Sequence, residues 1–200
     1  MVPLFKETNF ALVGNLGRPR NAVLIGVGLA ETASHLHALG TKVVALEADP
    51  DLLDRATDLA SEAHPVDLAS PNPFAILADR RFDLIAVEGA QLIADLPRFF
   101  ARAAEHLVDG GHVVVCSQSG RLEVREALEQ AGLDVLRYDL NPRVFRSKLP
   151  SGATKAVDDL RITHTVSFRA TYALLRHLER LIALGQPDLL AAEHIYVARV

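Results

Sequence analysis

The stretch AVLIGVGLAETASHLHALGTKVVALEAD, residues 22–49, decides the fold of this chain. An apolar run ends in Gly26-Val27-Gly28, a stretch with helical spacing follows, and a second apolar run ends at Glu47. A strand, a glycine-containing turn, a helix and a second strand form a β-α-β unit. Such units build parallel sheets and often hold a nucleotide at their first turn. The stretch therefore predicts a parallel sheet with a ligand site at this turn.

The same alternation continues through the first two-thirds of the chain. The predicted strands are residues 22–26, 42–47, 64–67, 82–87, 112–116 and 133–138. The predicted helices are residues 29–39, 50–62, 72–80, 95–107 and 122–131. Apolar runs without alternation indicate strands that are buried on both faces. Together they predict an α/β fold with a doubly wound, mostly parallel sheet.

The last third departs from this pattern. Residues 160–168 alternate between apolar and polar side chains, which predicts a half-buried, antiparallel strand. Residues 172–184 form an amphipathic pattern typical of a helix, and a final strand is predicted at residues 194–200. We therefore expect one domain over residues 1–200. It would have an N-terminal arm at 1–20, a helical insertion on the substrate side at 141–192, and antiparallel strands at its C-terminal end.

Composition excludes several classes of protein. Half of the 200 residues are hydrophobic and the net charge is −4, which excludes a disordered acidic tail and a bulk nucleic-acid binder. No apolar run reaches membrane-spanning length and residues 1–10 lack a signal-peptide core, so a soluble, cytoplasmic protein is expected. Cys116 is the single cysteine, and the histidines lack metal-ligand spacing, so no metal site is expected.

The glycine turn favours one kind of nucleotide. Glycine lets the backbone approach a ligand, and Glu47, 21 residues after Gly26, has the spacing of an acid that binds both ribose hydroxyls. The third glycine of a dinucleotide site is replaced by Glu31, whose charge would repel a pyrophosphate. The lysine and hydroxyl residue of an ATP-binding P-loop are also missing. Adenosine with a ribose diol and no phosphates fits best, which points to S-adenosylmethionine.

Across roughly residues 20–140 the chain resembles the class I S-adenosylmethionine-dependent methyltransferases. Their first loop reads approximately acid-x-G-x-G-x-G, and residues 24–30 read LIGVGLA. The segment HLVDGGHVVV, residues 106–115, resembles the family's L-x-P-G-G turn before the fifth strand. The resemblance implies a Rossmann-like fold, S-adenosylmethionine as cofactor, and methyl transfer to a small acceptor.

The resemblance also implies a set of cofactor-binding residues at the ends of four strands. In it, Asp67 would meet the adenine amino group, and Glu88 would face the sulfonium and the acceptor. The complete set is Gly26, Val27, Gly28, Glu47, Ala48, Asp67, Leu68, Glu88 and Gly89.

Two residues depart from the family pattern. Leu24 replaces the acid that helps to hold the methionine amino group, and Ala30 replaces the third glycine. Families on the same fold that transfer an aminoalkyl group often carry an apolar residue at the first position. The chain is similar to spermidine synthases in VLIG and LEADP, and to nicotianamine synthases in the residues ETAS after the glycine turn. Aminoalkyl transfer from S-adenosylmethionine or its decarboxylated form, and a non-catalytic ligand-binding or partner subunit, therefore remain alternatives.

The acceptor side offers weaker signals. His164 stands on the apolar face of its predicted strand, either as a hydrogen-bonded core residue or as a general base facing the acceptor. Between residues 143 and 180 there are eight basic and three acidic residues, which indicates either a solvated surface or a site for an anionic acceptor. Few aromatic residues accompany them, which disfavours a nucleic-acid acceptor. The sequence is compatible with both a monomer and a homodimer.

Overall fold

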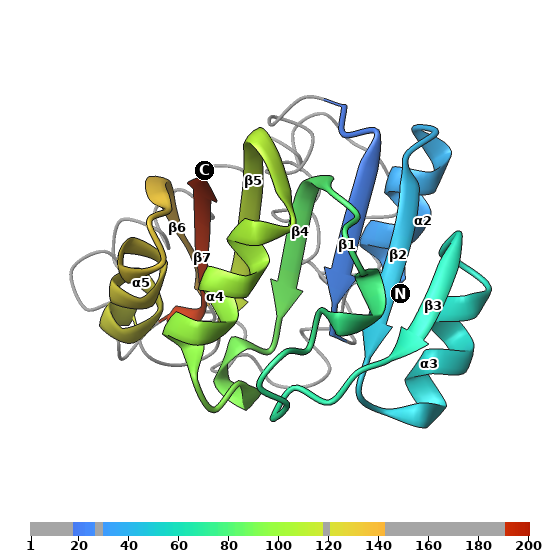
Figure 1. Cartoon of the computed structure of the whole chain (residues 1–200), viewed down its shortest axis with the longest axis horizontal. Helices are drawn as coiled ribbons and strands as arrows, with labels where there is room; N and C mark the ends of the chain where they lie inside the picture. The colour runs from blue at the N-terminus through green and yellow to red at the C-terminus, as the bar shows by residue number, and fades with distance from the viewer. Residues whose placement is uncertain (1–17, 27–29, 118–120, 143–190) are drawn as a thin grey trace, which may run out of the picture. The chain divides into compact units, whose positions relative to one another are not determined.

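The computed structural model describes residues 18–26, 30–117, 121–142 and 191–200 (Figure 1). The chain divides into two compact units, one of Met1–Asp139 with His194–Val200 and one of Leu140–Glu193. Almost all described residues belong to the first unit. The strand predicted at 160–168 and the helix predicted at 172–184 lie outside the described residues.

Within these residues, seven strands form one sheet in the order β3-β2-β1-β4-β5-β7-β6 (Figure 1). They are β1 Asn21–Ile25, β2 Lys42–Glu47, β3 Glu62–Pro65, β4 Phe82–Glu88, β5 Leu107–Ser117, β6 Asp134–Pro142 and β7 Ala191–Arg199. All pairings among β1 to β5 are parallel, and β7 pairs with β5 in the antiparallel direction. The predicted fold class, a mostly parallel Rossmann-like sheet with an antiparallel C-terminal strand, is confirmed.

Helices connect the parallel strands. They are α2 Ala30–Ala38, α3 Pro50–Thr57, α4 Leu96–Glu105 and α5 Arg121–Gln130, with short 3-10 turns η2 Ala75–Leu77 and η3 Ala90–Leu92. Asp49 and Asp95 begin α3 and α4 by accepting hydrogen bonds from backbone amides of the first turn. None of the described helices has the length and apolar character needed to cross a membrane.

The alternation of side chains along each strand divides the core into two layers. One apolar cluster joins Val23 and Ile25 of β1 to α4 and α5. The other joins Ala22 and Leu24 of β1 to Leu36 of α2. Because both faces of β1 are covered by apolar side chains, its residues are all apolar apart from the first, as the sequence predicts.

Several predicted boundaries are wrong, among them the end of the helix predicted at 50–62, which stops at Thr57. The third strand is Glu62–Pro65 rather than 64–67, because α3 ends at Thr57 and Ser61 already donates its backbone N–H to Val43 O. In place of the helix predicted at 72–80 there is only the short 3-10 turn Ala75–Leu77. Ala78, with a φ of 49°, ends this turn. β5 begins at Leu107 rather than 112, because Leu107 pairs with the start of β4 ahead of a register shift.

Candidate cofactor site

The predicted site residues that the structure describes follow the carboxyl ends of four neighbouring parallel strands. Ile25, the last residue of β1, is paired with Leu46 on one side and with Val87 on the other. The chain continues from β1 outward to β2 on one side and later to β4 on the other, so the strand order reverses at this point. Ligands of open α/β sheets bind outside the carboxyl ends of the strands at such a reversal.

Gly26 is required by the geometry of this reversal. Its φ is +98°, a conformation that residues with a side chain rarely adopt. A Cβ at this position would lie 2.4 Å from the backbone oxygen of Glu88. The N–H of Gly26 donates to Leu46 O at 3.1 Å, which ties the turn to β2. The turn after β1 is thus held between the ends of β2 and β4.

Glu47 presents a buried carboxylate at the end of β2. Its side chain is 5% exposed, and Oε1 accepts hydrogen bonds from the backbone N–H groups of Ala48 and Asp49 at 2.7 and 2.9 Å. Within the described residues no donor contacts Oε2 by a hydrogen bond. One oxygen therefore fixes the side chain, while the other can accept bonds from a diol. Asp49 accepts instead from Asp51 N as the cap of α3.

Asp67 and Leu68 follow β3. The adjacent Val66 N–H donates to the backbone oxygen of Glu47 at 3.0 Å, so this loop is joined to the end of β2. Asp67 is exposed and its Oδ1 accepts from Ala69 N at 2.9 Å. Leu68 is partly buried and lines a cavity of about 80 Å³ shared with Ile93 after η3. The two residues differ in environment, one polar at the surface and one apolar against the core.

Glu88 and Gly89 close the other side of the reversal. Glu88 ends β4 opposite Cys116 of β5, and its Oε2 is buried. Gly89 has a φ of +79° and donates its N–H to Cys116 O at 3.2 Å. This turn leads into η3, where Leu92 is 68% exposed. The predicted sulfonium-side residues thus lie at the carboxyl end of β4, next to the glycine turn.

Leu24, the main departure from the family pattern, is an apolar core residue. It is 2% exposed and packs in the cluster that includes Ala33 and Leu36 of α2. It therefore offers no charge to a ligand at the end of β1. Val27, Gly28 and His164, three further predicted site residues, lie outside the described residues.

Two histidines, His106 and His112, lie on either side of the start of β5 and are partly or fully engaged with the rest of the fold. His106 Nδ1 lies 3.0 Å from Arg80 O, and its ring stacks on Phe74. His112 begins the inner part of β5, where burial, aided by the positive charge of Arg199, lowers its pKa. Neither residue is at the carboxyl ends of the strands.

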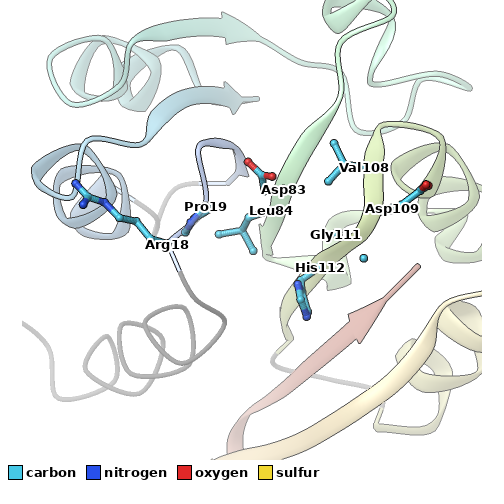
Figure 2. A pocket seen from close by; sticks show the side chains of 9 residues that line it. Arg18, Pro19, Asp83, Leu84, Val108, Asp109, Gly111 and His112 are labelled. Atoms are coloured by element: carbon cyan, nitrogen blue, oxygen red, sulfur yellow. The ribbon is translucent and has the colours of Figure 1, made fainter.

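A larger cavity, of about 200 Å³, lies at the opposite ends of β4 and β5 (Figure 2). Leu84, Val108 and His112 are among its lining residues. Asp83 also lines it, but its Oδ2 accepts from the backbone N–H groups of Arg20 and Asn21 at 2.8 and 2.9 Å. This carboxylate therefore serves to fix the start of β1. The cavity is separate from the reversal point and was not predicted from sequence.

Residues 23–115 match the family model of the methyltransferase domain. This match, over just under half of the chain, supports the predicted likeness to the class I S-adenosylmethionine-dependent methyltransferases. The matched range runs from β1 into β5 and includes the glycine turn, Glu47, Asp67 and Glu88. The match therefore agrees with the family predicted from sequence.

Solved structures of methyltransferases share the fold of this chain. A SAM-dependent methyltransferase from Archaeoglobus fulgidus gives a TM-score of 0.68 at 13% identity, over 100% of this chain and 95% of that one. One from Mesorhizobium loti gives 0.65 at 15% identity, over 97% and 96%. Phosphoethanolamine N-methyltransferase 2 from Haemonchus contortus, in complex with S-adenosyl-L-methionine, gives 0.52 at 15% identity, over 96% and 52%. No curated protein matches the sequence.

Proposed function

We propose that this chain is an active methyltransferase that binds S-adenosylmethionine at the carboxyl ends of β1, β2 and β4. The observation that carries the proposal is the buried Glu47 carboxylate, anchored through Oε1 beside a turn that only glycine can form. A fixed carboxylate oxygen suits a ribose diol, because it accepts from both hydroxyls without losing further side-chain freedom. The residues present therefore fit the cofactor.

Each predicted residue has a role in this proposal. Gly26, with Val27 and Gly28, lets backbone lie against the donor, and Glu47 with Ala48 binds the ribose. Leu68 contacts the adenine ring while Asp67 accepts from its amino group. Glu88 and Gly89 lie on the sulfonium side. The full set of nine residues is the one predicted from sequence.

The cofactor supplies an electrophilic methyl group on a positively charged sulfur. The protein's contribution is to orient the donor and the acceptor so that the acceptor atom faces this methyl group, which is catalysis by proximity. Segment 141–192 would bind the acceptor, with His164 as the candidate general base. The excess of basic residues between 143 and 180 supports a small anionic acceptor. Action in the cytoplasm, without a nucleic-acid or membrane partner, belongs to the same proposal, and a homodimer stays open.

Leu24 supports a second candidate function, aminoalkyl transfer. In methyl transfer the methionine tail stays bound while the methyl group leaves. An apolar, 2% exposed Leu24 gives this tail no ionic partner at its usual place. If the tail itself were the transferred group, a nucleophile would attack its γ-carbon, and methylthioadenosine would leave with the electron pair of the broken C–S bond.

Product analysis separates these functions. The protein is incubated with S-adenosylmethionine and a panel of small carboxylates and phosphate esters, and adenosine-containing products are resolved by chromatography. We expect S-adenosylhomocysteine that depends on both enzyme and acceptor, and its loss in Glu47→Gln. Methylthioadenosine as the main product would favour the aminoalkyl alternative. Donor binding without turnover of any acceptor would favour a non-catalytic subunit.

A further inference from the structure

The proposed function leaves the methionine ammonium of the donor without its usual partner, because Leu24 is apolar. Strand alternation places two acids after Leu24 on the same face of the sheet, Glu47 on β2, which is proposed to bind the ribose, and Glu88 on β4. Leu84 and Ala86 of β4 belong to the same apolar cluster as Leu24. Since alternate residues of a strand share a face, Glu88 leaves β4 on the face where Leu24 leaves β1.

The register places Glu88 one step above Leu24 toward the ligand end. Leu24 is paired with Ala86, and Glu88 follows Ala86 by two residues, about 7 Å along the strand. Its Cβ lies 3.5 Å from the position that a Cβ on Gly26 would occupy. The side chain of Glu88 thus begins directly beside the glycine turn. A carboxylate there is two residues nearer the ligand end of the sheet than an acid at residue 24 would be, on the same face.

Burial strengthens the effect of this carboxylate. Glu88 is half-buried, and its Oε2 is shielded from solvent. A charge that is partly removed from water attracts an opposite charge more strongly than an exposed one. An ammonium group, with three N–H donors and a full charge, is the complementary ligand.

A second polar group occurs in the first turn of α2, which follows the glycine turn. Thr32 is 1% exposed, and its Oγ1 makes no hydrogen bond to any residue the structure describes. Buried hydroxyls normally have a hydrogen-bond partner, so this hydroxyl is available to a polar group of the cofactor. Its neighbour Ala33 and Leu36 pack on the cluster that contains Leu24. Thr32 therefore adds a polar group to the helix that covers this face.

We propose that Glu88 replaces the missing acid of β1 and holds the ammonium group of the donor's methionine tail. This assignment makes Glu88 a positioning residue and rests on the proposed function. It explains how a chain with leucine at position 24 can keep the tail fixed, as methyl transfer requires. The alternative role for the Glu88 carboxylate is a general base that faces the acceptor. Loss of the first role would weaken binding of the donor, whereas loss of the second would leave donor binding unchanged.

The test compares three ligands that share adenosine and differ in the tail. S-adenosylhomocysteine carries both ammonium and carboxylate, its decarboxylated form carries the ammonium alone, and methylthioadenosine carries neither. Binding to the intact chain is measured by calorimetry for the wild type, Glu88→Gln and Glu88→Asp. Glu126→Gln, an exposed glutamate on α5, is the matched control. Thermal unfolding verifies that each variant is folded.

We expect Glu88→Gln to weaken the two ammonium-bearing ligands about 10- to 100-fold, the range for loss of a charge-assisted hydrogen bond. Methylthioadenosine should change less than twofold, and Glu88→Asp, which keeps the charge, should be affected less. Equal weakening of all three ligands, or no weakening of any, would overturn the assignment. Glu47→Gln should weaken all three ligands, since all carry the ribose. If the wild type binds none of them, the proposed function itself fails.

Discussion

At the scale of single residues, Gly26 decides whether the site can form. Its φ of +98° and the 2.4 Å that would separate an added Cβ from Glu88 O penalise any side chain twice. Gly132, with a φ of +77° and no atom within 4 Å of such a Cβ, carries the conformational penalty alone. We expect Gly132→Ala to lower the free energy of unfolding by about 1 kcal/mol. Gly26→Ala should lower it by at least about 2 kcal/mol more, because backbone atoms must move. Urea unfolding of both variants measures the difference, and equal losses would contradict the crowding at Gly26.

Glu47 has one oxygen in a structural role and one available to the ligand, and two substitutions separate these roles. Glu47→Gln keeps an oxygen that can accept from Ala48 and Asp49, so its stability should change little. Removal of the charge should weaken S-adenosylhomocysteine binding by about 2 kcal/mol, roughly 30-fold. Glu47→Ala should lose the same binding and also about 1–2 kcal/mol of stability. Calorimetry and urea unfolding check the two effects. An unchanged affinity in both variants would remove Glu47 from the site.

Sequence could predict Gly26 and Glu47, because their spacing is local to one β-α-β unit. It could not show that Glu88 shares a face with Leu24, since that depends on the register between β1 and β4. The unpartnered hydroxyl of Thr32, among the described residues, is likewise visible only once α2 packs on the sheet. Pairing between distant strands, rather than residue type, sets these relations.

At the scale of elements, the cap of α3 can be separated from ligand binding. Asp49 Oδ1 accepts from Asp51 N at 2.9 Å, and asparagine can make the same bond. We expect Asp49→Ala to lower the free energy of unfolding by about 1 kcal/mol, and Asp49→Asn to lower it much less. Neither change should alter S-adenosylhomocysteine affinity more than about threefold. A large loss of affinity in Asp49→Asn would instead show that this carboxylate binds the ribose.

Element boundaries were predictable where a local signal exists. β2 spans Lys42–Glu47 as predicted, because Gly40 and the Asp49-Pro50 cap mark both sides. The start of β3 was not predictable, because it is set by hydrogen bonds between Ser61 and Val43 of β2. Ser61 N–H donates to Val43 O, and Ser61 Oγ accepts from Val43 N. Those contacts link residues far apart in the chain and leave no periodic signal.

At the scale of the whole molecule, His112 makes stability depend on pH. Burial, and secondarily Arg199 across the sheet on β7, lower its pKa in the folded protein below the usual value of about 6.5. Between these two pKa values the unfolded chain binds more protons, so the free energy of unfolding falls as pH decreases below about 6.5. His112→Asn should remove this component, while His37→Asn at an exposed site of α2 should not. Urea unfolding from pH 7.5 to 5 tests this, and parallel wild-type and His112→Asn profiles would contradict it.

The segment before the last strand is predicted to serve the acceptor rather than the donor. Replacement of residues 172–184 by a short linker should abolish methyl transfer while leaving S-adenosylhomocysteine binding, because the donor site uses the ends of β1, β2 and β4. Calorimetry and product chromatography on the same preparation separate the two functions. Full activity after the replacement would assign the acceptor to another part of the chain.

A crystal structure of the chain with S-adenosylhomocysteine tests the central claim most directly. We predict density at the carboxyl ends of the parallel strands, with the ribose hydroxyls about 3 Å from the Glu47 carboxylate. The adenosine would lie toward the loop after β3 and the amino-acid tail toward Gly26 and Glu88. Density instead in the cavity lined by Leu84 and His112 (Figure 2), or none at either place with saturating ligand, would contradict it.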